Sequence, residues 1–237
     1  MARARTRRGP DVRDFLRHLP LFAGLGPDEI ARLAAGTAQR RLRRGDVLFR
    51  QGDPSAAMHA VVHGSIALTV RAPRGRERVS DIIGPGRSFG EAILFLEKPY
   101  IVGARALTDA LVLQVAKEAV FAELGRNSGF ARRIIAALAA KLHATVRELD
   151  LYALGSASRR FAAWLLRSAP AAEGAGASVT LPASKKTVAS RLNLSAEHLS
   201  RILRELAAEG LIEVSGRKVR VADLDRLRAH AEGVSGP

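Results

Sequence analysis

Cysteine is absent from this chain of 237 residues, and acidic side chains are few. Without thiolates the protein can form no disulfide and hold no iron–sulfur cluster or cysteine-ligated zinc, and thiol-based redox sensing is excluded. Lys and Arg number 38 against 23 Asp and Glu, a formal net charge of +15. This excess favours a polyanionic partner such as double-stranded DNA, because cationic side chains replace the counterions around phosphates. An Arg- and Ala-rich composition is equally typical of a GC-rich genome, so charge alone does not establish that partner.

Long apolar runs and catalytic patterns are also missing. No stretch approaches the roughly 18 to 20 apolar residues of a membrane span. The basic N-terminus, MARARTRRGPD, lacks the apolar stretch that follows it in a secretory signal. No nucleophile–base arrangement or metal-ligand spacing is present. We therefore expect a cytoplasmic protein with no membrane partner and no enzymatic activity, in which residues 1–20 form a basic arm and the start of a first helix.

Short β-type runs fill the segment that follows. From Arg40 onward, β-branched or alternating runs are separated by glycines at positions where turns need them. The candidate strands are residues 47–49, 58–62, 66–70, 79–83, 101–106 and 111–115. Regular short strands with glycine turns are typical of a jelly roll, so we expect residues 21–125 to form a β-roll domain.

A long helix is predicted next, over residues 126–154. Its apolar positions recur in alternating steps of four and three, the spacing of a coiled-coil seam. A core helix shows the same stripe over two turns, but more than three heptads favour a partner helix and hence a homodimer. The predicted seam residues are Ile135, Leu138, Leu142, Thr145, Leu149 and Tyr152. A break near residues 154–157 predicts a hinge.

The last segment, residues 155–237, contains two short helices joined by a tight turn. Ser184 and Ser195 are suitable N-caps for the two helices, and Asn193 and Leu194 lie between them. The segment GLIEVSGRKVRV then predicts a two-stranded wing that turns at residues 215–216. An ordinary helical hairpin is the alternative, but together these features favour a winged helix-turn-helix.

The exposed half of the second helix carries the side chains that a major-groove helix needs. Glu197 can accept a hydrogen bond from a cytosine amino group, and Arg201 can donate to guanine or clamp a phosphate. Ser200 can serve either a base or a phosphate, and His198 lies beside them. The nearby cations expected to hold phosphates are Lys185, Lys186, Arg191 and Arg217. For each of them a solvated surface charge is the alternative.

Three segments, RRGDVLFRQGDPS, HGSIALTV and IGPGRSFGEAILF, resemble the β-roll of CRP/FNR transcription regulators. The resemblance implies an α+β protein with a cyclic-nucleotide-binding-type β-roll, a dimerisation helix and a winged helix-turn-helix. It also implies RNA polymerase as a partner. The run from Glu197 to Arg201 is similar to the E-x-x-S-R reading motif of FNR-type regulators, which implies a TTGAT-N4-ATCAA operator. His198 stands where the family usually has Thr or another small residue, and Ala196 where cyclic AMP receptor proteins have arginine.

The same resemblance bears on the sensed ligand. Gly90 and Glu91 match the turn that cradles ribose and phosphate, but Tyr100 stands where the family has its phosphate-binding arginine. Burying a phosphate without that cation is costly, so cyclic AMP is disfavoured. Arg105 is a possible substitute. The remaining predicted pocket residues are Leu142 and Thr145 of the long helix.

Haem is the other candidate effector. The segment FGEAILFLEKPYIVGARAL resembles the DNR branch of the family, regulators of denitrification thought to use haem, which implies a nitric-oxide or redox sensor of anaerobic genes. The candidate axial ligands are His18, His59, His63, His143 and Met58. No pair of them has a diagnostic spacing. Another small molecule, no ligand at all, and a ligand-binding module without DNA function remain as alternatives.

Overall fold

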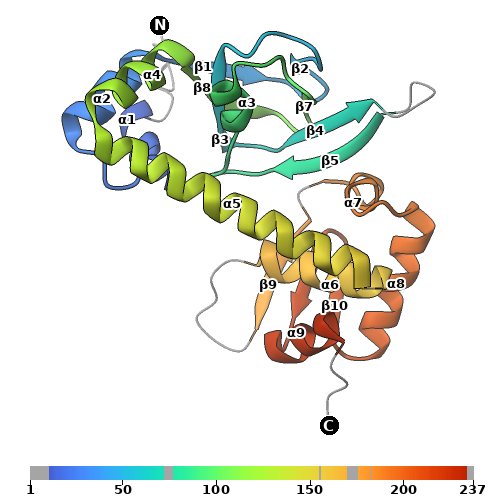
Figure 1. Cartoon of the computed structure of the whole chain (residues 1–237). Helices are drawn as coiled ribbons and strands as arrows, with labels where there is room; N and C mark the ends of the chain where they lie inside the picture. Colours follow the sequence, from blue (N-terminus) through green and yellow to red (C-terminus); the bar gives the residue numbers. More distant parts are fainter. Residues whose placement is uncertain (1–10, 72–76, 155, 170–175, 182, 234–237) are drawn as a thin grey trace, which may run out of the picture. The chain divides into compact units, whose positions relative to one another are not determined.

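The computed structural model describes residues 11–71, 77–154, 156–169, 176–181 and 183–233 (Figure 1). The chain divides into two compact units. The first comprises Met1–Leu68 and Ile83–Ala140, and the second comprises Thr69–Ile82 and Lys141–Pro237. No helix among these described residues is long and apolar enough to span a membrane.

Helices at both ends of the β-roll share one hydrophobic core. Their bounds are α1 (Val12–Arg17), η1 (Pro20–Phe22), α2 (Pro27–Ala35) and α4 (Lys117–Arg126). Asp11 caps α1 by accepting the N–H of Arg13, and Pro27 begins α2, where its missing N–H costs nothing. Phe22, Ile30 and Phe130 are fully buried together in this core. Burial of these side chains explains why helices so short are stable.

The β-roll consists of two four-stranded sheets. Their strands are β1 (Thr37–Leu42), β2 (Val47–Phe49), β3 (Ala57–His63), β4 (Ile66–Arg71), β5 (Glu77–Ile83), β6 (Ser88–Phe89), β7 (Gly103–Ala106) and β8 (Ala110–Ala116). One sheet has the order β1-β8-β3-β6 and the other β2-β7-β4-β5. A second core cluster draws residues from both sheets, among them Phe49, Val61, Ile66 and Val112. The expected jelly-roll architecture is confirmed.

Three local features differ from the sequence expectation. The roll begins at Thr37, because β1 pairs with β8 although most of its side chains are polar and exposed. Glu91 begins a short helix, α3 (Glu91–Leu96), rather than a simple turn. The strand predicted from residue 101 begins at Gly103. In the β3–β4 turn, Gly64 has φ +84°, and a Cβ there would lie 2.4 Å from the Asp109 carbonyl oxygen, so only glycine fits.

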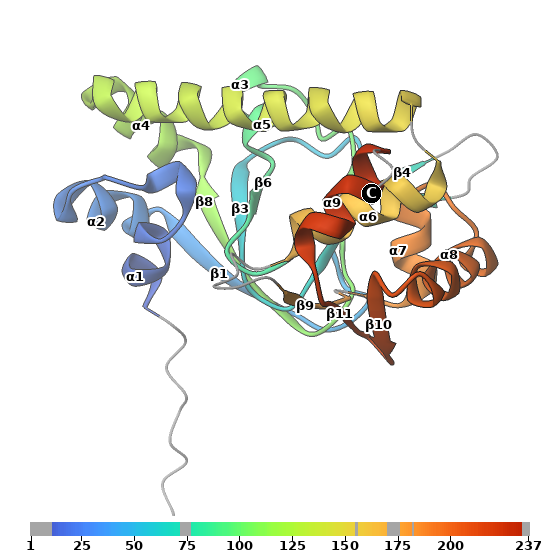
Figure 2. The same ribbon diagram turned by 90° about the horizontal axis from the view of Figure 1, so that it is seen from below.

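The predicted long helix is α5 (Ser128–Leu154), a single continuous helix of 27 residues (Figure 2). Near its start, the Asn127 side chain accepts the N–H of Phe130. The division of the chain into four segments stays a prediction. The two compact units have other bounds. The predicted hinge includes residue 155, which lies outside the described residues.

The second unit contains the helix-turn-helix and its wing. Its elements are α6 (Ala157–Ser168), β9 (Ala177–Thr180), α7 (Lys185–Arg191), α8 (Ala196–Ala208), β10 (Ile212–Ser215), β11 (Lys218–Val221) and α9 (Leu224–Glu232). The wing is part of a three-stranded sheet in the order β10-β11-β9, where two strands were expected, because Val179 pairs with Val219. Phe161 and Trp164 of α6 stack with ring centroids 5.8 Å apart in this unit.

Candidate DNA-reading surface and sensor site

Serine caps position the two helices of the DNA-binding motif. The Ser184 hydroxyl accepts the N–H of Thr187 at the start of α7, and the Ser195 hydroxyl accepts that of His198 at the start of α8. Between the helices, Asn193 has φ +56°, a left-handed conformation that asparagine tolerates better than most residues. The N–H of Leu194 donates to the Ala189 carbonyl at 2.9 Å and closes the turn. The turn between α7 and α8 therefore follows from local chemistry.

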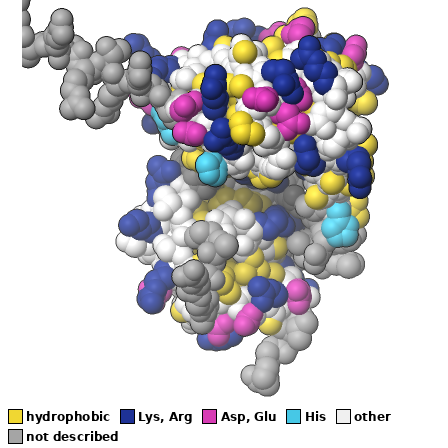
Figure 3. Space-filling model, turned by 90° about the vertical axis from the view of Figure 1, so that its left-hand side faces the viewer, with side chains coloured by type: hydrophobic (Ala, Val, Ile, Leu, Met, Phe, Trp, Pro, Cys, Tyr) yellow, Lys and Arg dark blue, Asp and Glu magenta, His cyan; other side chains and the backbone are white. Residues whose placement is uncertain are grey.

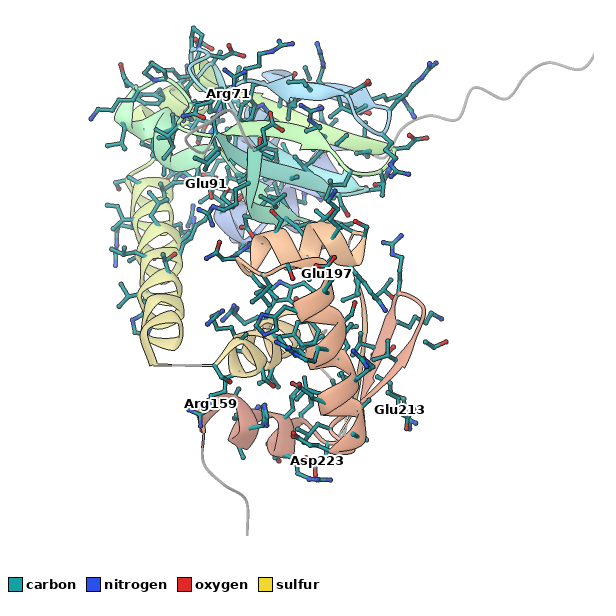
Figure 4. All side chains as sticks on the ribbon, turned by 90° about the vertical axis from the view of Figure 1, so that its right-hand side faces the viewer. Arg71, Glu91, Arg159, Glu197, Glu213 and Asp223 are labelled. Carbon is teal, nitrogen blue, oxygen red and sulfur yellow. The ribbon has the colours of Figure 1, made fainter. Side chains whose placement is uncertain are left out.

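Burial separates the two faces of α8. Its buried face consists of Leu199, Ile202, Leu203 and Leu206. Glu197 and Arg201 are exposed on the other face, and His198 and Ser200 are half-buried. Glu197 lies at the N-terminal end of α8 (Figure 4). The first two turns of α8 thus present the predicted reading residues on one helix.

Local contacts prepare these side chains for polar recognition. The pKa of the Glu197 carboxyl is lowered by its own backbone N–H, then by the Ser195 hydroxyl and the charge of Lys186, so it accepts hydrogen bonds as an ionised group. The Ser200 hydroxyl donates to the Ala196 carbonyl at 2.9 Å. Arg201 Nε lies 3.8 Å from Glu205 Oε1, and both side chains are more than half exposed. Such a pair is weak, so Arg201 can exchange it for a base or phosphate.

Of the four residues predicted to contact phosphates, two lysines are exposed and two arginines have acceptors within the protein. Lys185 and Lys186 are exposed at the start of α7. Arg217, in the wing turn, donates Nε and Nη2 to the Leu181 carbonyl at 3.1 and 2.6 Å. Arg191 is only 14% exposed and pairs with Asp81. On the face seen in Figure 3, Lys and Arg side chains are interspersed with Asp and Glu, so the positive charge does not form one patch there.

An exposed apolar stripe runs along α5. Ile135 and Leu142 are each 66% exposed, and Val146 is 48% exposed. Leu138 instead packs partly against the helical core of the first unit. Thr145 is exposed and donates its hydroxyl to the Lys141 carbonyl at 2.9 Å. The side chains of the other two predicted seam residues, Leu149 and Tyr152, lie outside the described residues. Val146 was not among the predicted seam residues, because its spacing departs from the heptad.

In the β-roll, Gly90 and Glu91 lie against a buried aromatic cluster. Gly90 has φ +87° and begins α3, and a Cβ there would lie 3.3 Å from His59 Nδ1 and 3.6 Å from a ring carbon of Tyr100. The side chain of Glu91 is buried. The Tyr100 hydroxyl donates to the Ala57 carbonyl at 2.8 Å, and burial raises the pKa of this phenol. A hydrogen-bonded phenol therefore occupies the position expected for the phosphate-binding arginine.

Arg105 does not replace that arginine. Its residue on β7 is exposed, whereas Ala104 and Ala106 on either side are buried in the roll. Side chains alternate between the faces of a strand, so Arg105 points away from the core that its neighbours enter. Arg105, the predicted substitute for the phosphate-binding arginine, is thus on the face of β7 that points away from the core.

The candidate haem ligands have contrasting surroundings. His59 is buried against the rings of Phe49 and Phe89, whose centroids are 5.2 and 5.1 Å from its own, and burial lowers its pKa to about 4. Its Nε2 lies 3.2 Å from Gln114 Nε2, and its Nδ1 has no hydrogen-bond partner. Met58 is fully buried on the neighbouring position of β3. The remaining candidates, His18, His63 and His143, are exposed. The described residues form no cluster of three or more metal-binding His, Cys, Asp or Glu side chains.

Haem fits this arrangement poorly. The His59 side chain is buried and packs against the rings of Phe49, Phe89 and Tyr100, so a porphyrin could reach its ring nitrogens only by displacing these core side chains. The exposed histidines lack the enclosing apolar walls of a haem pocket. The described histidines and Met58 therefore do not form a haem site.

Comparison with known proteins identifies both domains. Residues 39–127 match the cyclic nucleotide-binding domain, and residues 159–230 match the Crp-like helix-turn-helix domain. The Cyclic AMP receptor protein of Thermus thermophilus is 33% identical over 217 residues, which cover 91% of this chain and 98% of that protein.

Two solved structures extend the likeness. DNR from Pseudomonas aeruginosa is 28% identical with a TM-score of 0.52, over 97% of this chain and 99% of that one. The c-di-GMP-responsive global regulator CLP of Xanthomonas campestris is 25% identical with a TM-score of 0.64, over 83% and 99%. The names of the Thermus and Xanthomonas proteins give different nucleotides, cyclic AMP and c-di-GMP. Because the likeness to the Thermus protein extends over nearly the full length of both chains, this chain belongs to the CRP/FNR family of DNA-binding transcription regulators.

Proposed function

We propose that the protein is a cytoplasmic, ligand-responsive homodimer that binds a near-palindromic FNR-like operator, TTGAT-N4-ATCAA. One observation carries the proposal: Glu197, Ser200 and Arg201 lie on the outer side of a capped helix whose opposite face is buried. In a helix-turn-helix protein the N-terminal residues of the second helix contact base edges in the major groove. Each well-placed base contact contributes about 1–3 kcal/mol of discrimination.

In the proposed complex, the ionised Glu197 accepts a hydrogen bond from a cytosine amino group. Arg201 leaves Glu205 and donates to guanine O6 and N7. Lys185 and Lys186 contact phosphates at the start of α7, and these contacts position the helix without reading sequence. RNA polymerase stays a predicted partner.

The apolar stripe on α5 supports a homodimer. Ile135, Leu142 and Val146 are large apolar side chains that lie at helical spacing and are exposed in the single chain. Burying them against the same stripe of a second copy removes apolar surface from water, at about 25 cal/mol per Å². A two-fold dimer then presents two copies of α8 to two half-sites roughly one DNA turn apart.

The proposed effector is a small molecule bound beside Gly90 in the β-roll. The alternatives are a cyclic nucleotide, as the Thermus relative's name indicates, and haem, as the DNR resemblance implies. Neither Tyr100 nor the outward Arg105 supplies the cation that a cyclic phosphate needs at this cluster. Haem is disfavoured because His59 is buried among aromatic side chains and the other candidate histidines are exposed.

Two binding assays test the function. The first measures binding of the full-length protein to the TTGAT-N4-ATCAA duplex and to a scrambled duplex, over a range of salt concentrations. Preference for the operator in the wild type, lost in Arg201→Ala, is expected. The second measures the melting temperature with cyclic AMP, with cyclic di-GMP and with haem, since a ligand that binds the folded state raises it. A Soret band that shifts with nitric oxide would favour haem as the effector and contradict the conclusion that the histidines do not fit it.

A further inference from the structure

The first helix of the DNA-binding motif is attached to a β-strand by two side-chain contacts. Arg191 Nε lies 3.1 Å from Asp81 Oδ1, and the Ser190 hydroxyl accepts the backbone N–H of Val79 at 3.1 Å. Ser190 and Arg191 are at the C-terminal end of α7, and Val79 and Asp81 are on β5. All four residues belong to the second compact unit. Two adjacent helix residues thus hold two alternate residues of one strand.

The Asp81–Arg191 ion pair is more enclosed than the Arg201–Glu205 pair on α8. The Arg191 and Asp81 side chains are 14% and 31% exposed, against 61% and 52% for Arg201 and Glu205. Water screens an ion pair less when its partners are partly buried, so the Asp81–Arg191 pair is the stronger of the two. Asp81 Oδ1 also accepts the N–H of Ile82 at 2.8 Å, which orients the carboxylate.

The strand that carries Asp81 has an open side. β5 is the last strand of the order β2-β7-β4-β5, so among the described residues no strand pairs with one of its two sides. The N–H of Val79 is instead satisfied by Ser190. Two residues after Asp81, Ile83 enters the cluster that contains Phe89 and Tyr100. The strand therefore connects the predicted effector site to Asp81 through three consecutive residues.

A carboxylate and a phosphate compete for the same guanidinium. Both accept paired N–H donors from arginine with similar geometry, and arginine keeps its charge at any physiological pH. Arg191 is at the end of the first helix of the motif, where phosphate contacts are expected. While Asp81 accepts the Nε–H of Arg191, that donor is not available to the DNA backbone.

We propose that Asp81 and Arg191 form an autoinhibitory clasp, in which the Asp81 carboxylate takes the place of a DNA phosphate. Operator binding then requires Arg191 to exchange Asp81 for the DNA backbone, with loss of the Ser190–Val79 hydrogen bond. An effector that moves Ile83 shifts β5 and weakens the clasp. This inference rests on the proposed DNA-binding function. It differs from a purely structural contact in its sign, because breaking a clasp strengthens DNA binding and breaking a structural contact does not.

The test uses full-length protein without effector and the operator duplex. Asp81→Asn keeps the shape of the side chain and its acceptor for Ile82 but removes the charge that holds Arg191. The variant is expected to bind the operator roughly fivefold more tightly, the factor that corresponds to about 1 kcal/mol. Its salt dependence is expected to be steeper by about one phosphate contact per freed arginine. Ser190→Ala removes the neutral contact, so affinity is expected to rise without a change of salt slope.

Two controls separate the clasp from general charge and folding effects. Glu232→Gln removes one exposed negative charge from α9 and is expected to leave affinity nearly unchanged. In an Arg191→Ala background, Asp81→Asn is expected to have no effect, because the two residues act as a pair. Melting temperatures of all variants report folding.

The outcomes distinguish the two proposals. If the wild type shows no salt-sensitive preference for the operator, the proposed function fails. If the wild type binds but Asp81→Asn binds no more tightly than the wild type, or gains equally with and without Arg191, the clasp is overturned and the pair is a structural contact. A gain that depends on Arg191 supports the clasp.

Discussion

Tyr100 stacks on Phe49 with ring centroids 3.8 Å apart and planes inclined by 12°. The stack places a phenol against the Gly90 turn, at the position where the family resemblance expects the arginine that binds a cyclic phosphate. The hydroxyl of Tyr100 is committed to the Ala57 carbonyl. The Tyr100–Phe49 stack gives the candidate sensor site its apolar, aromatic character.

Tyr100→Phe tests the contribution of that hydroxyl to stability. The change removes the hydrogen bond and leaves the Ala57 carbonyl without this donor, while the ring stack is kept. The free energy of unfolding is expected to fall by about 1 kcal/mol in urea titrations. Thr145→Val, which removes an exposed hydroxyl bonded within its own helix, is the matched control and is expected to cost less. Equal losses in the two variants would contradict the structural role of Tyr100.

The burial of His59 predicts a pH dependence of stability. Its pKa is lowered to about 4 in the folded protein, from 6.5 when solvated. Between these two pKa values His59 is protonated in the unfolded chain and neutral in the folded one. Its contribution to the free energy of unfolding is therefore retained above pH 6.5 and decreases as the pH falls toward 4. Between pH 7 and pH 5 this group alone should remove about 2 kcal/mol.

The measurement compares urea unfolding of the wild type and His59→Gln at those two pH values. Glutamine carries no titratable group, so the difference between pH 7 and pH 5 is expected to be smaller in the variant by that amount. If both proteins show the same pH dependence, His59 is not the buried neutral group described here.

Glu123 holds α4 to α2 through Arg32. Its carboxylate accepts Nε and Nη2 of that arginine at 2.8 and 2.9 Å, and its side chain is only 1% exposed. The hydrogen bonds from Arg32 lower the pKa of Glu123, so this stabilisation is present above the ordinary pKa of glutamate and is lost as the pH falls below it. Glu123→Gln is expected to cost about 2 kcal/mol, because the amide has no negative charge and only one of the two oxygens that accept from Arg32. A chemical unfolding curve at pH 7 coincident with that of the wild type would show that the pair contributes nothing.

The stripe on α5 predicts that Ile135→Glu weakens self-association. A charge at a buried dimer seam is costly, and the variant should elute as a monomer at concentrations where the wild type is a dimer. Ala140→Glu is the matched control, since position 140 is exposed on α5 about 140° around the helix from Ile135 at 100° per residue. Sedimentation of both variants provides the readout. A dimeric Ile135→Glu, or an equally monomeric control, would argue against this seam.

Local signals in the sequence predict much of the DNA-binding unit. Ser184 and Ser195 mark the beginnings of α7 and α8, and the apolar spacing of Leu199 and Leu206 predicts which face is buried. Residues three or four apart meet on a helix whatever lies elsewhere in the chain, so this information is contained in short segments.

Pairings between distant segments were not predictable in the same way. β1 has no apolar alternation because its side chains face solvent, and it is a strand only through its partner β8. β9 joins the wing by pairing with β11, about forty residues away. The sequence predicts that Arg191 and Arg217 contact phosphates. In the structure they donate to the Asp81 carboxylate and the Leu181 carbonyl, which belong to segments distant in the sequence. The burial of His59 likewise depends on rings contributed by other strands.

The most direct test of the account is the affinity of the wild type and Arg201→Ala for the TTGAT-N4-ATCAA duplex, measured by fluorescence anisotropy against a scrambled duplex of equal length. If Arg201 reads a base in each half-site, the substitution removes about 1–3 kcal/mol of discrimination per half-site and leaves binding to the scrambled duplex nearly unchanged. Wild-type preference for the operator that disappears in the variant is the predicted result. Equal preference in both proteins, or no salt-sensitive binding in either, would contradict the assignment of α8 as the reading helix.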